Sequence, residues 1–384
     1  MLENLIKVNQ VSPLKYDKRI GIMSASGMGK TFTTYHVLSD WCGDDYIIFD
    51  TGMEGGLTAL ENARYIETQS WSDYIDSINQ VIIAKVMGQM DIKMVAIDTV
   101  DELQRMAEAH IVDKYNSENP GKPVKSINDG ALGFGVGLNQ AANKILNTLQ
   151  RLENAGIGMW LVFHSKMRER EDEISNETYK ELTSDLGSST FNKYLTKLDI
   201  LGTIYTSREI EQKTKINFVG KTEKEGKLKA ESRIMTFRDE SSAIRSKSRF
   251  ADIVDSIELD PKEFDKAVTD AIQKATKLDD DKFKKRVAEF EKKREEEFGS
   301  DKFDDLIRVD KIRYIKSFEK FLREIGQGDM FDETMKRLQA KYKLEKVNDL
   351  WDNKEVPLDE LYNSLKKLAE RLGTDYELVS FLEA

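Results

Sequence analysis

The sequence predicts an α/β fold with a mostly parallel central sheet, followed by a C-terminal all-α module. Up to residue 275, short apolar runs alternate with amphipathic stretches of helical period, which is typical of strands that alternate with covering helices. Three of these runs end in a polar side chain, at Asp50, Asp98 and His164. Parallel strands of this kind place their terminal residues together at one edge of the sheet. Beyond residue 276 only helical periodicity remains.

The composition limits the kinds of function that the chain could have. Hydrophobic residues make up 39% of the 384 residues, enough to fill a core, and the net charge of −10 argues against general polyanion binding. Any nucleic-acid surface must therefore be local. The single cysteine, Cys42, allows no intramolecular disulfide and no cysteine-based zinc site. With no apolar run of 18 residues and no signal-peptide pattern, we expect a cytoplasmic protein that is not bound to a membrane.

The segment Lys18–Tyr35, KRIGIMSASGMGKTFTTY, has the order of a strand, a glycine loop and a helix. This order is that of a phosphate-binding P-loop. Gly27 and Gly29 allow the backbone to turn tightly enough for its N–H groups to surround phosphate oxygens. A helix that begins near Lys30 would point its positive end toward the same anion.

Specific roles follow for the side chains of this P-loop. Lys30 would reach the β- and γ-phosphates of ATP, and the Thr31 hydroxyl would ligate Mg²⁺. Ser24 stands where the motif usually has its first glycine, which restricts the backbone but removes no phosphate-binding group. The predicted nucleotide-binding residues are Ser24, Ala25, Ser26, Gly27, Met28, Gly29, Lys30, Thr31 and Phe32.

Two further strands are predicted to end beside this loop. Tyr46–Asp50 is a short apolar run, and Lys93–Thr99 is an apolar run that contains Asp98 near its end. Asp98 lies about 70 residues after the P-loop, at a Walker B position, where a strand-end carboxylate meets the Mg²⁺ shell. Between these strands, Ser72 is predicted to cap a helix that runs to about Met87.

The rest of the core is predicted from apolar periodicity and from turn residues. Residues 116–137 contain five glycines and two prolines and are expected to form a loop. Residues 165–190 are polar and are expected to form a second long loop. The predicted helices are 138–152 and 261–275, and the predicted strands are 158–164, 200–205, 215–219 and 233–237, the last two flanking a turn at Gly226.

The C-terminal part carries no recognisable chemistry. In residues 279–297, 15 of 19 side chains are charged, and an apolar stripe at helical spacing is formed only by Phe283, Val287 and Phe290. We expect an exposed connecting helix there, with a partner-binding coiled coil as the alternative. The predicted domains are 1–275, a charged helical linker 276–299, and a helical module 300–384 that could bind a protein partner.

Over about residues 15–275 the chain resembles the RecA-like P-loop ATPases, and most of all their phage-encoded recombination and single-strand-annealing branch. The resemblance implies a RecA-like core that binds ATP and Mg²⁺. In that family a carboxylate soon after a strand-end Asp polarises the attacking water, which makes Glu54 of FDTGMEGGL the candidate base and leaves Asp50 as the alternative. His164 in LVFHSK matches a γ-phosphate sensor, although a strand-end histidine can also make only a structural hydrogen bond.

The resemblance also implies active sites at the interfaces of a homo-oligomer. RecA-like ATPases receive cations from a neighbouring subunit, and Ser246–Arg249 resembles the Lys-x-Arg finger of such enzymes. Lys247 and Arg249 are therefore candidate catalytic residues that would act on the γ-phosphate of the neighbour. Ordinary surface charge is the alternative for both.

Single-stranded DNA is the partner that the resemblance implies. The DNA loops of the family correspond to 114–137 and 165–190, and the first offers cations and one aromatic platform, namely Lys114, Lys122, Lys125 and Phe134. Residues 213–238 add eight Lys/Arg against three Glu, either as a basic hairpin for DNA or as solvated charge. A ring-forming translocase or helicase accessory, and a nucleotide-bound scaffold with little turnover, are the alternative functions.

Overall fold

The computed structural model describes residues 10–52, 55–86, 90–172, 176–216, 222–238, 243–298, 328–346 and 349–353, with single helical residues at 312, 316, 319, 323 and 358. The chain divides into two compact units. One unit comprises Met1–Tyr74 and Asp91–Arg294, and the other comprises Ile75–Met90 and Glu295–Ala384. The first unit contains every residue of the predicted site that the structure describes.

A parallel sheet forms the centre of the first unit. Its parallel strands run in the order β7-β1-β5-β4-β2-β3, so β1 lies between β5 and β7. The bounds are β1 (Ile20–Ser24), β2 (Tyr46–Asp50), β3 (Tyr65–Glu67), β4 (Met94–Asp98), β5 (Gly158–Glu171) and β7 (Ile200–Ile216). This confirms the predicted α/β class with a mostly parallel sheet. The strands β1, β2 and β4 are buried along their whole length, as their unbroken apolar runs predict.

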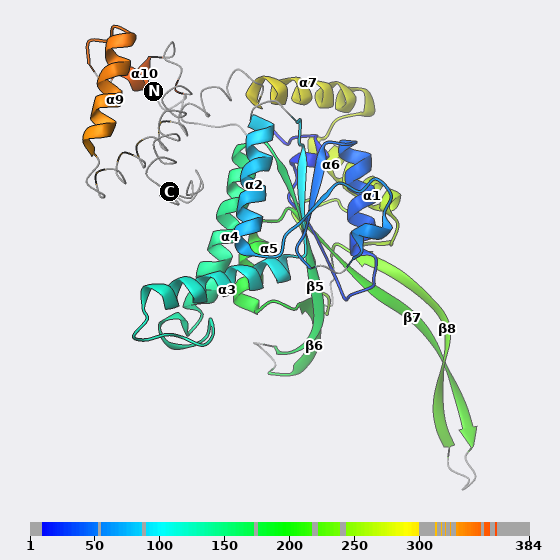
Figure 1. Ribbon diagram of the computed structural model, residues 1–384. Helices are drawn as coiled ribbons and strands as arrows, with labels where there is room; N and C mark the ends of the chain where they lie inside the picture. The colour runs from blue at the N-terminus through cyan, green and yellow to red at the C-terminus, as the bar shows by residue number, and fades with distance from the viewer. Residues whose placement is uncertain are drawn as a thin grey trace. The chain divides into compact units, whose positions relative to one another are not determined.

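Helices cover both faces of the sheet, and Figure 1 shows α1 and α6 on one side and α3, α4 and α5 on the other. Their bounds are α1 (Lys30–Cys42), α3 (Val100–Glu118), α4 (Val136–Asn154), α5 (Ser188–Lys197) and α6 (Pro261–Thr276). On the first face, the ring of Trp160 lies 5.9 Å from Trp41 and 5.4 Å from Phe264. On the second face, the rings of Phe163 and Phe191 lie 5.4 Å apart. These contacts hold β5 between two hydrophobic layers.

The prediction of a loop over 165–190 is wrong. β5 continues to Glu171 and forms a hairpin with β6 (Thr178–Ser184), and α5 follows. The hairpin has no apolar run because its outer residues are polar on both faces, and charged pairs across the strands take the place of a core. Arg170 Nε lies 2.9 Å from Glu181 Oε2, the oxygen of a buried carboxylate.

The predicted turn at Gly226 is wrong, because one continuous strand passes through it and includes most of the predicted strand 233–237. Of the predicted strand 215–219, residues 217–219 lie outside the described residues. β7 reaches Ile216 and pairs along its outer part with β8 (Thr222–Thr236), and Gly226 lies inside β8 opposite Gln212. The result is a long antiparallel arm that leaves the lower end of the sheet in Figure 1. Opposite charges across the arm replace apolar packing, as in the 2.9 Å ion pair of Arg208 with Glu231, so a hydrophobicity pattern could not reveal these strands.

Smaller differences occur at helix ends and near the sheet margins. The helix α2 (Trp71–Val86) begins before Ser72, and its first turn is capped by Ser70, whose Oγ accepts a 3.2 Å hydrogen bond from Asp73 N. The predicted loop at 116–137 is confirmed over residues 119–135, whereas its first three and last two residues belong to α3 and α4. Two short antiparallel strands, β9 (Lys247–Ser248) and β10 (Ser256–Glu258), escaped prediction because they are too short to show a period.

The charged segment after the core does form a helix, α7 (Asp280–Phe298). Its apolar stripe does not face solvent: Phe283, Val287 and Phe290 pack against the core cluster of the first unit. The second unit contains α9 (Gly328–Lys341) and α10 (Asp349–Asp352), in keeping with a helical module, whereas the predicted domain bounds stay a prediction. None of the helices in the described residues is both long and apolar enough to cross a membrane.

Candidate functional site

The glycine loop joins β1 to α1 at the carboxyl edge of the sheet. β1 ends at Ser24 and α1 begins at Lys30, as the sequence predicts. Gly27 has φ 74° and Gly29 has φ 97°, backbone conformations that favour glycine. Ser24 is buried, and its Oγ donates a 2.8 Å hydrogen bond to Ala25 O, which shows how a serine is accommodated in place of the usual glycine.

The side chain of Lys30 lies within this loop. It is only 5% exposed, and its Nζ donates hydrogen bonds to Ala25 O at 3.1 Å and Ser24 O at 3.3 Å. Carbonyl oxygens therefore hold the ammonium on the concave side of the loop, where the oxygens of a phosphate would offer stronger acceptors. Phe32 is half-exposed on the first turn of α1 and its ring lies 4.2 Å from that of His36.

Hard oxygen donors gather next to Lys30, where Mg²⁺ is expected. The hydroxyl of Thr31 donates a 2.6 Å hydrogen bond to Asp98 Oδ2, and Asp98 is paired in register with Asp50 on the neighbouring strand. Both carboxylates are 7% exposed, and both line a small cavity with Thr31 and Gly56. Such donors fit Mg²⁺, which binds one or two protein oxygens and completes its shell with phosphate and water.

The predicted base cannot be placed, because Glu54 lies outside the described residues. Asp50, its alternative, is fixed at the end of β2, where its Oδ1 accepts a 3.3 Å hydrogen bond from Gly52 N. No cluster of three or more His, Cys, Asp or Glu side chains suited to a metal occurs in the part of the chain that the structure describes. Mg²⁺ that is coordinated mostly by nucleotide phosphates and water needs no such cluster, so its binding is compatible with that finding.

His164 reaches the same edge because β5 lies between the P-loop strand and the Walker B strand. It is in register with Ser24 of β1, and its side chain is half-buried. Its backbone N donates a 2.8 Å hydrogen bond to Asp101 Oδ2, and its backbone O accepts one from Asp185 N at 2.9 Å. The strand order thus brings Lys30, Asp98 and His164 to one edge of the parallel sheet, on or after three adjacent strands.

Asp101 is a site residue that the sequence analysis missed. It lies in the first turn of α3, is 1% exposed, and burial raises its pKa to about 6. Its Oδ1 has no hydrogen-bond partner among the described residues. The available signal was its spacing: a second aspartate three residues after Asp98, just behind the helix cap Thr99, enters the helix at the site edge.

This buried carboxyl group predicts a pH-dependent stability. Because the pKa of Asp101 rises from its ordinary value of 3.8 to about 6 on folding, the folded chain binds more protons between these values, and stability falls as the pH rises through them. Between about pH 4 and pH 7, the wild type should lose about 2–3 kcal/mol more free energy of unfolding than Asp101→Asn. Urea denaturation of both proteins across this range measures the difference; parallel pH profiles would contradict it.

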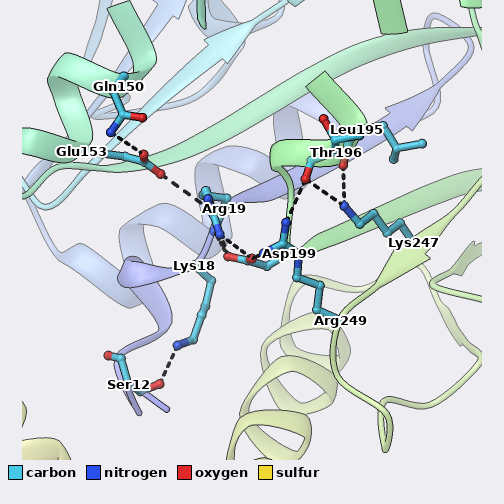
Figure 2. Close-up of polar contacts among 10 residues, drawn as sticks. All are labelled: Ser12, Lys18, Arg19, Gln150, Glu153, Leu195, Thr196, Asp199, Lys247 and Arg249. Carbon is cyan, nitrogen blue, oxygen red and sulfur yellow. Dashed lines mark hydrogen bonds and ion pairs between the residues drawn. The ribbon is translucent and has the colours of Figure 1, made fainter. Parts of the chain in front are cut away.

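Lys247 and Arg249 lie at the other edge of the sheet. β9 pairs with the first residues of β7, and Ile200 of β7 is in register with Ile20, the first residue of β1. Figure 2 shows both cations directed at the end of α5. Lys247 Nζ donates to Leu195 O at 2.6 Å, and Arg249 Nη2 donates to Thr196 O at 2.8 Å.

These two cations therefore have a structural role within the chain. Their positive charges stabilise the negative carboxyl end of α5. Arg249 Nη1 also lies 3.3 Å from Asp199 Oδ1, an oxygen that Arg19 Nη2 contacts at 3.0 Å (Figure 2). Neither cation can reach the P-loop of its own chain from this edge. Their action on a neighbouring subunit stays a prediction.

Comparison with known proteins identifies the family. The family model described as AAA domain matches residues 17–250, which contain the P-loop, Asp98 and His164. The chain belongs to the AAA domain family. The match is in keeping with a P-loop enzyme that hydrolyses ATP, and the site described above is the candidate site for its nucleotide.

One solved structure is similar in part to this AAA domain ATPase. It is an ATPase from the type III secretion system of pathogenic bacteria, with 14% sequence identity and a TM-score of 0.30. The similarity covers 49% of this chain and 51% of that chain, so this AAA domain ATPase spans about half the length of its solved relative. No curated protein matches the chain.

Proposed function

We propose that this ATPase is RecA-like and hydrolyses ATP with Mg²⁺ while bound to single-stranded DNA, in phage recombination or strand annealing. The ATP part follows from the family and from the convergence of Lys30, Thr31, Asp98 and His164. The DNA part depends on one observation, the display of Phe134 on an ordered loop. The experiment below tests that part directly.

In the ATP part, each side chain has a role set by its position. Backbone N–H groups of the glycine loop and Lys30 would bind the phosphates, and Thr31 and Asp98 would hold Mg²⁺. Bound Mg²⁺ would neutralise charge on the phosphate oxygens. Glu54 is proposed to orient and deprotonate the attacking water, with Asp50 as the alternative. His164, opposite Ser24 on the intervening strand, would contact the terminal phosphate.

The loop between α3 and α4 is ordered by its own contacts. Asn116 bonds to Val124 in both directions, with Nδ2 donating to O at 2.9 Å and Oδ1 accepting from N at 2.7 Å. The apolar side chains of Val124, Ile127 and Leu132 are buried under the loop. The loop is therefore a built surface whose backbone holds a fixed path, with its apolar side chains turned inward.

Phe134 is the exception in this loop. Its side chain is fully exposed, at 107% of the reference area, and its φ of 53° is uncommon for a non-glycine residue. Exposure of a phenyl ring in a strained backbone gains no folding energy, so we infer a binding role. Three exposed lysines lie on or beside the same loop: Lys114, Lys122 and Lys125.

An exposed ring beside lysines suits single-stranded rather than double-stranded DNA. Only unpaired bases present their faces for stacking, and the lysines would contact phosphates on either side. The hairpin β5–β6 and the arm β7–β8 extend from the carboxyl edge of the sheet, where the ATP site lies (Figure 1). A single strand of DNA bound at the loop could therefore pass near the hairpin and the arm, which adjoin the ATP site.

We predict that Phe134→Ala weakens binding of an oligothymidylate by about 5–100-fold, because base stacking contributes about 1–3 kcal/mol per base. Val136→Ala is the matched control, since Val136 is 46% exposed at the start of α4, two residues after Phe134, but has no ring to stack. Phe134→Trp should restore binding. Fluorescence anisotropy at fixed salt measures all three. Equal affinity of wild type and Phe134→Ala for the oligothymidylate would contradict the proposed DNA binding. If Phe134→Ala instead altered self-association of the protein, the ring would belong to a protein–protein contact.

The proposal includes a homo-oligomer with active sites at subunit interfaces. Lys247 and Arg249, at the edge remote from their own P-loop, would face the site of a neighbour. A ring-forming translocase is distinguished from a recombination ATPase by unwinding of a forked duplex. A scaffold with little turnover is distinguished from both by its ATP hydrolysis, which DNA would not stimulate.

A further inference from the structure

An arginine from the base of the β7–β8 arm lies against the P-loop. A Cβ atom placed on Gly29 would be 3.8 Å from Nη1 of Arg233 and 3.5 Å from Cδ2 of Leu259. Arg233 belongs to β8, more than 200 residues from Gly29 in sequence. The fold thus places a guanidinium group at the glycine that precedes Lys30, beside the start of α1.

Both strands of the arm approach the P-loop, at one pair of residues that lie opposite each other in the hairpin. Thr206 of β7 is directly opposite Arg233, so both side chains are on the same face of the arm. Thr206 Oγ1 lies 3.6 Å from the sulfur of Met28. Two successive P-loop residues therefore lie against one cross-strand pair: Met28 lies near Thr206, and Gly29 lies near Arg233.

Arg233 differs from the other arginine of the arm base. Arg208, on the next rung of the same face, is neutralised by its ion pair with Glu231. Arg233 is exposed, and among the described residues no hydrogen bond or ion pair involves its guanidinium. An uncompensated guanidinium next to a phosphate-binding loop is suited to an anion, because its planar donors match two phosphoryl oxygens.

We propose that Arg233 binds the phosphate chain of the nucleotide in the P-loop of its own chain. This inference rests on the proposed ATP site and adds to it a cation supplied in cis, distinct from Lys247 and Arg249. Because Arg233 is part of β8, phosphate binding joins the nucleotide to the base of the arm. The arm is then restrained when ATP is present and released when the phosphates leave.

The test compares Arg233→Ala with Arg208→Ala, a matched arginine one rung further out. ATP and inorganic tripolyphosphate each compete with a fluorescent ATP analogue for the site. Arg233→Ala should weaken both competitors by about 10–100-fold, since a charge-assisted hydrogen bond contributes about 1.5–3 kcal/mol. Arg208→Ala should leave both affinities within about twofold of wild type, because an exposed ion pair contributes little. Arg233→Lys should recover part of the loss and Arg233→Glu should increase it.

Hydrogen exchange adds a readout that a merely structural residue would not change. ATP should slow amide exchange at residues 228–236 of β8 in the wild type but not in Arg233→Ala. Wild-type affinity of Arg233→Ala for both competitors would overturn the inference, as would loss of ATP affinity without loss of tripolyphosphate affinity. Lys30→Ala distinguishes failure of the Arg233 contact from failure of the proposed ATP site. If Lys30→Ala binds tripolyphosphate like the wild type, the ATP site itself is wrong. If Lys30→Ala loses binding and Arg233→Ala does not, only the Arg233 contact is wrong.

Discussion

Lys30→Ala should lower the rate of ATP hydrolysis on the order of 10²–10³-fold and weaken ATP binding, while the protein stays folded. The Nζ of Lys30 lies in the concave side of the P-loop, where it donates hydrogen bonds to Ser24 O and Ala25 O. These bonds are replaceable by water, but no other described side chain within this loop can bring a positive charge to the phosphates. Steady-state hydrolysis and equilibrium binding of ATP measure the two effects.

Lys18→Ala is the matched control for this variant. Lys18 precedes β1 as Lys30 follows it, is 7% exposed, and donates a 2.5 Å hydrogen bond to Ser12 O. It lies at the edge of the sheet remote from the site. Its removal should lower thermal stability and leave hydrolysis by the folded protein unchanged. Normal turnover in Lys30→Ala would contradict the P-loop assignment.

Glu54→Gln should bind ATP normally and hydrolyse it on the order of 10²–10⁴-fold more slowly. The amide keeps the shape of the side chain but cannot accept a proton from water. Single-turnover hydrolysis, measured beside ATP affinity, separates this chemical defect from a binding defect. The expected signature is a large loss in kcat with ATP affinity unchanged.

Asp50→Asn provides the comparison, because Asp50 is the alternative base. Its carboxylate is in register with Asp98 and lines the cavity that contains Thr31, which places it near the expected metal. Asp50→Asn should therefore raise the Mg²⁺ concentration needed for half-maximal hydrolysis. If Asp50→Asn loses turnover at saturating Mg²⁺ and Glu54→Gln does not, the base is Asp50.

Burial determined how much of the fold could be predicted. The strands β1, β2 and β4 are buried on both faces, so each appears in the sequence as an unbroken apolar run. The outer parts of β5 and β7 lack such runs, and cross-strand ion pairs such as Arg208 with Glu231 occur there instead. Such strands have no hydrophobic period, so the sequence predicts loops and turns in their place.

The residues of the site also differ in how far the sequence could predict their positions. Residues at the end of a strand or just after the glycine loop, such as Asp98, Lys30 and Thr31, could be placed from the motif because the edge of a parallel sheet fixes them. Asp101 and Arg233 reach the same edge through the packing of α3 and the pairing of β8, which no local pattern encodes. The contacts of Lys247 and Arg249 with the end of α5 depend on a helix that the sequence does not predict.

The most direct test of the central claim is ATP hydrolysis by the wild type with Mg²⁺, measured with and without single-stranded DNA. We expect slow hydrolysis by the protein alone and a clear rise with single-stranded DNA, larger than the rise with duplex of the same length. Lys30→Ala should remove both rates, and Phe134→Ala should remove only the response to DNA. Hydrolysis that is identical with and without single-stranded DNA would contradict the account.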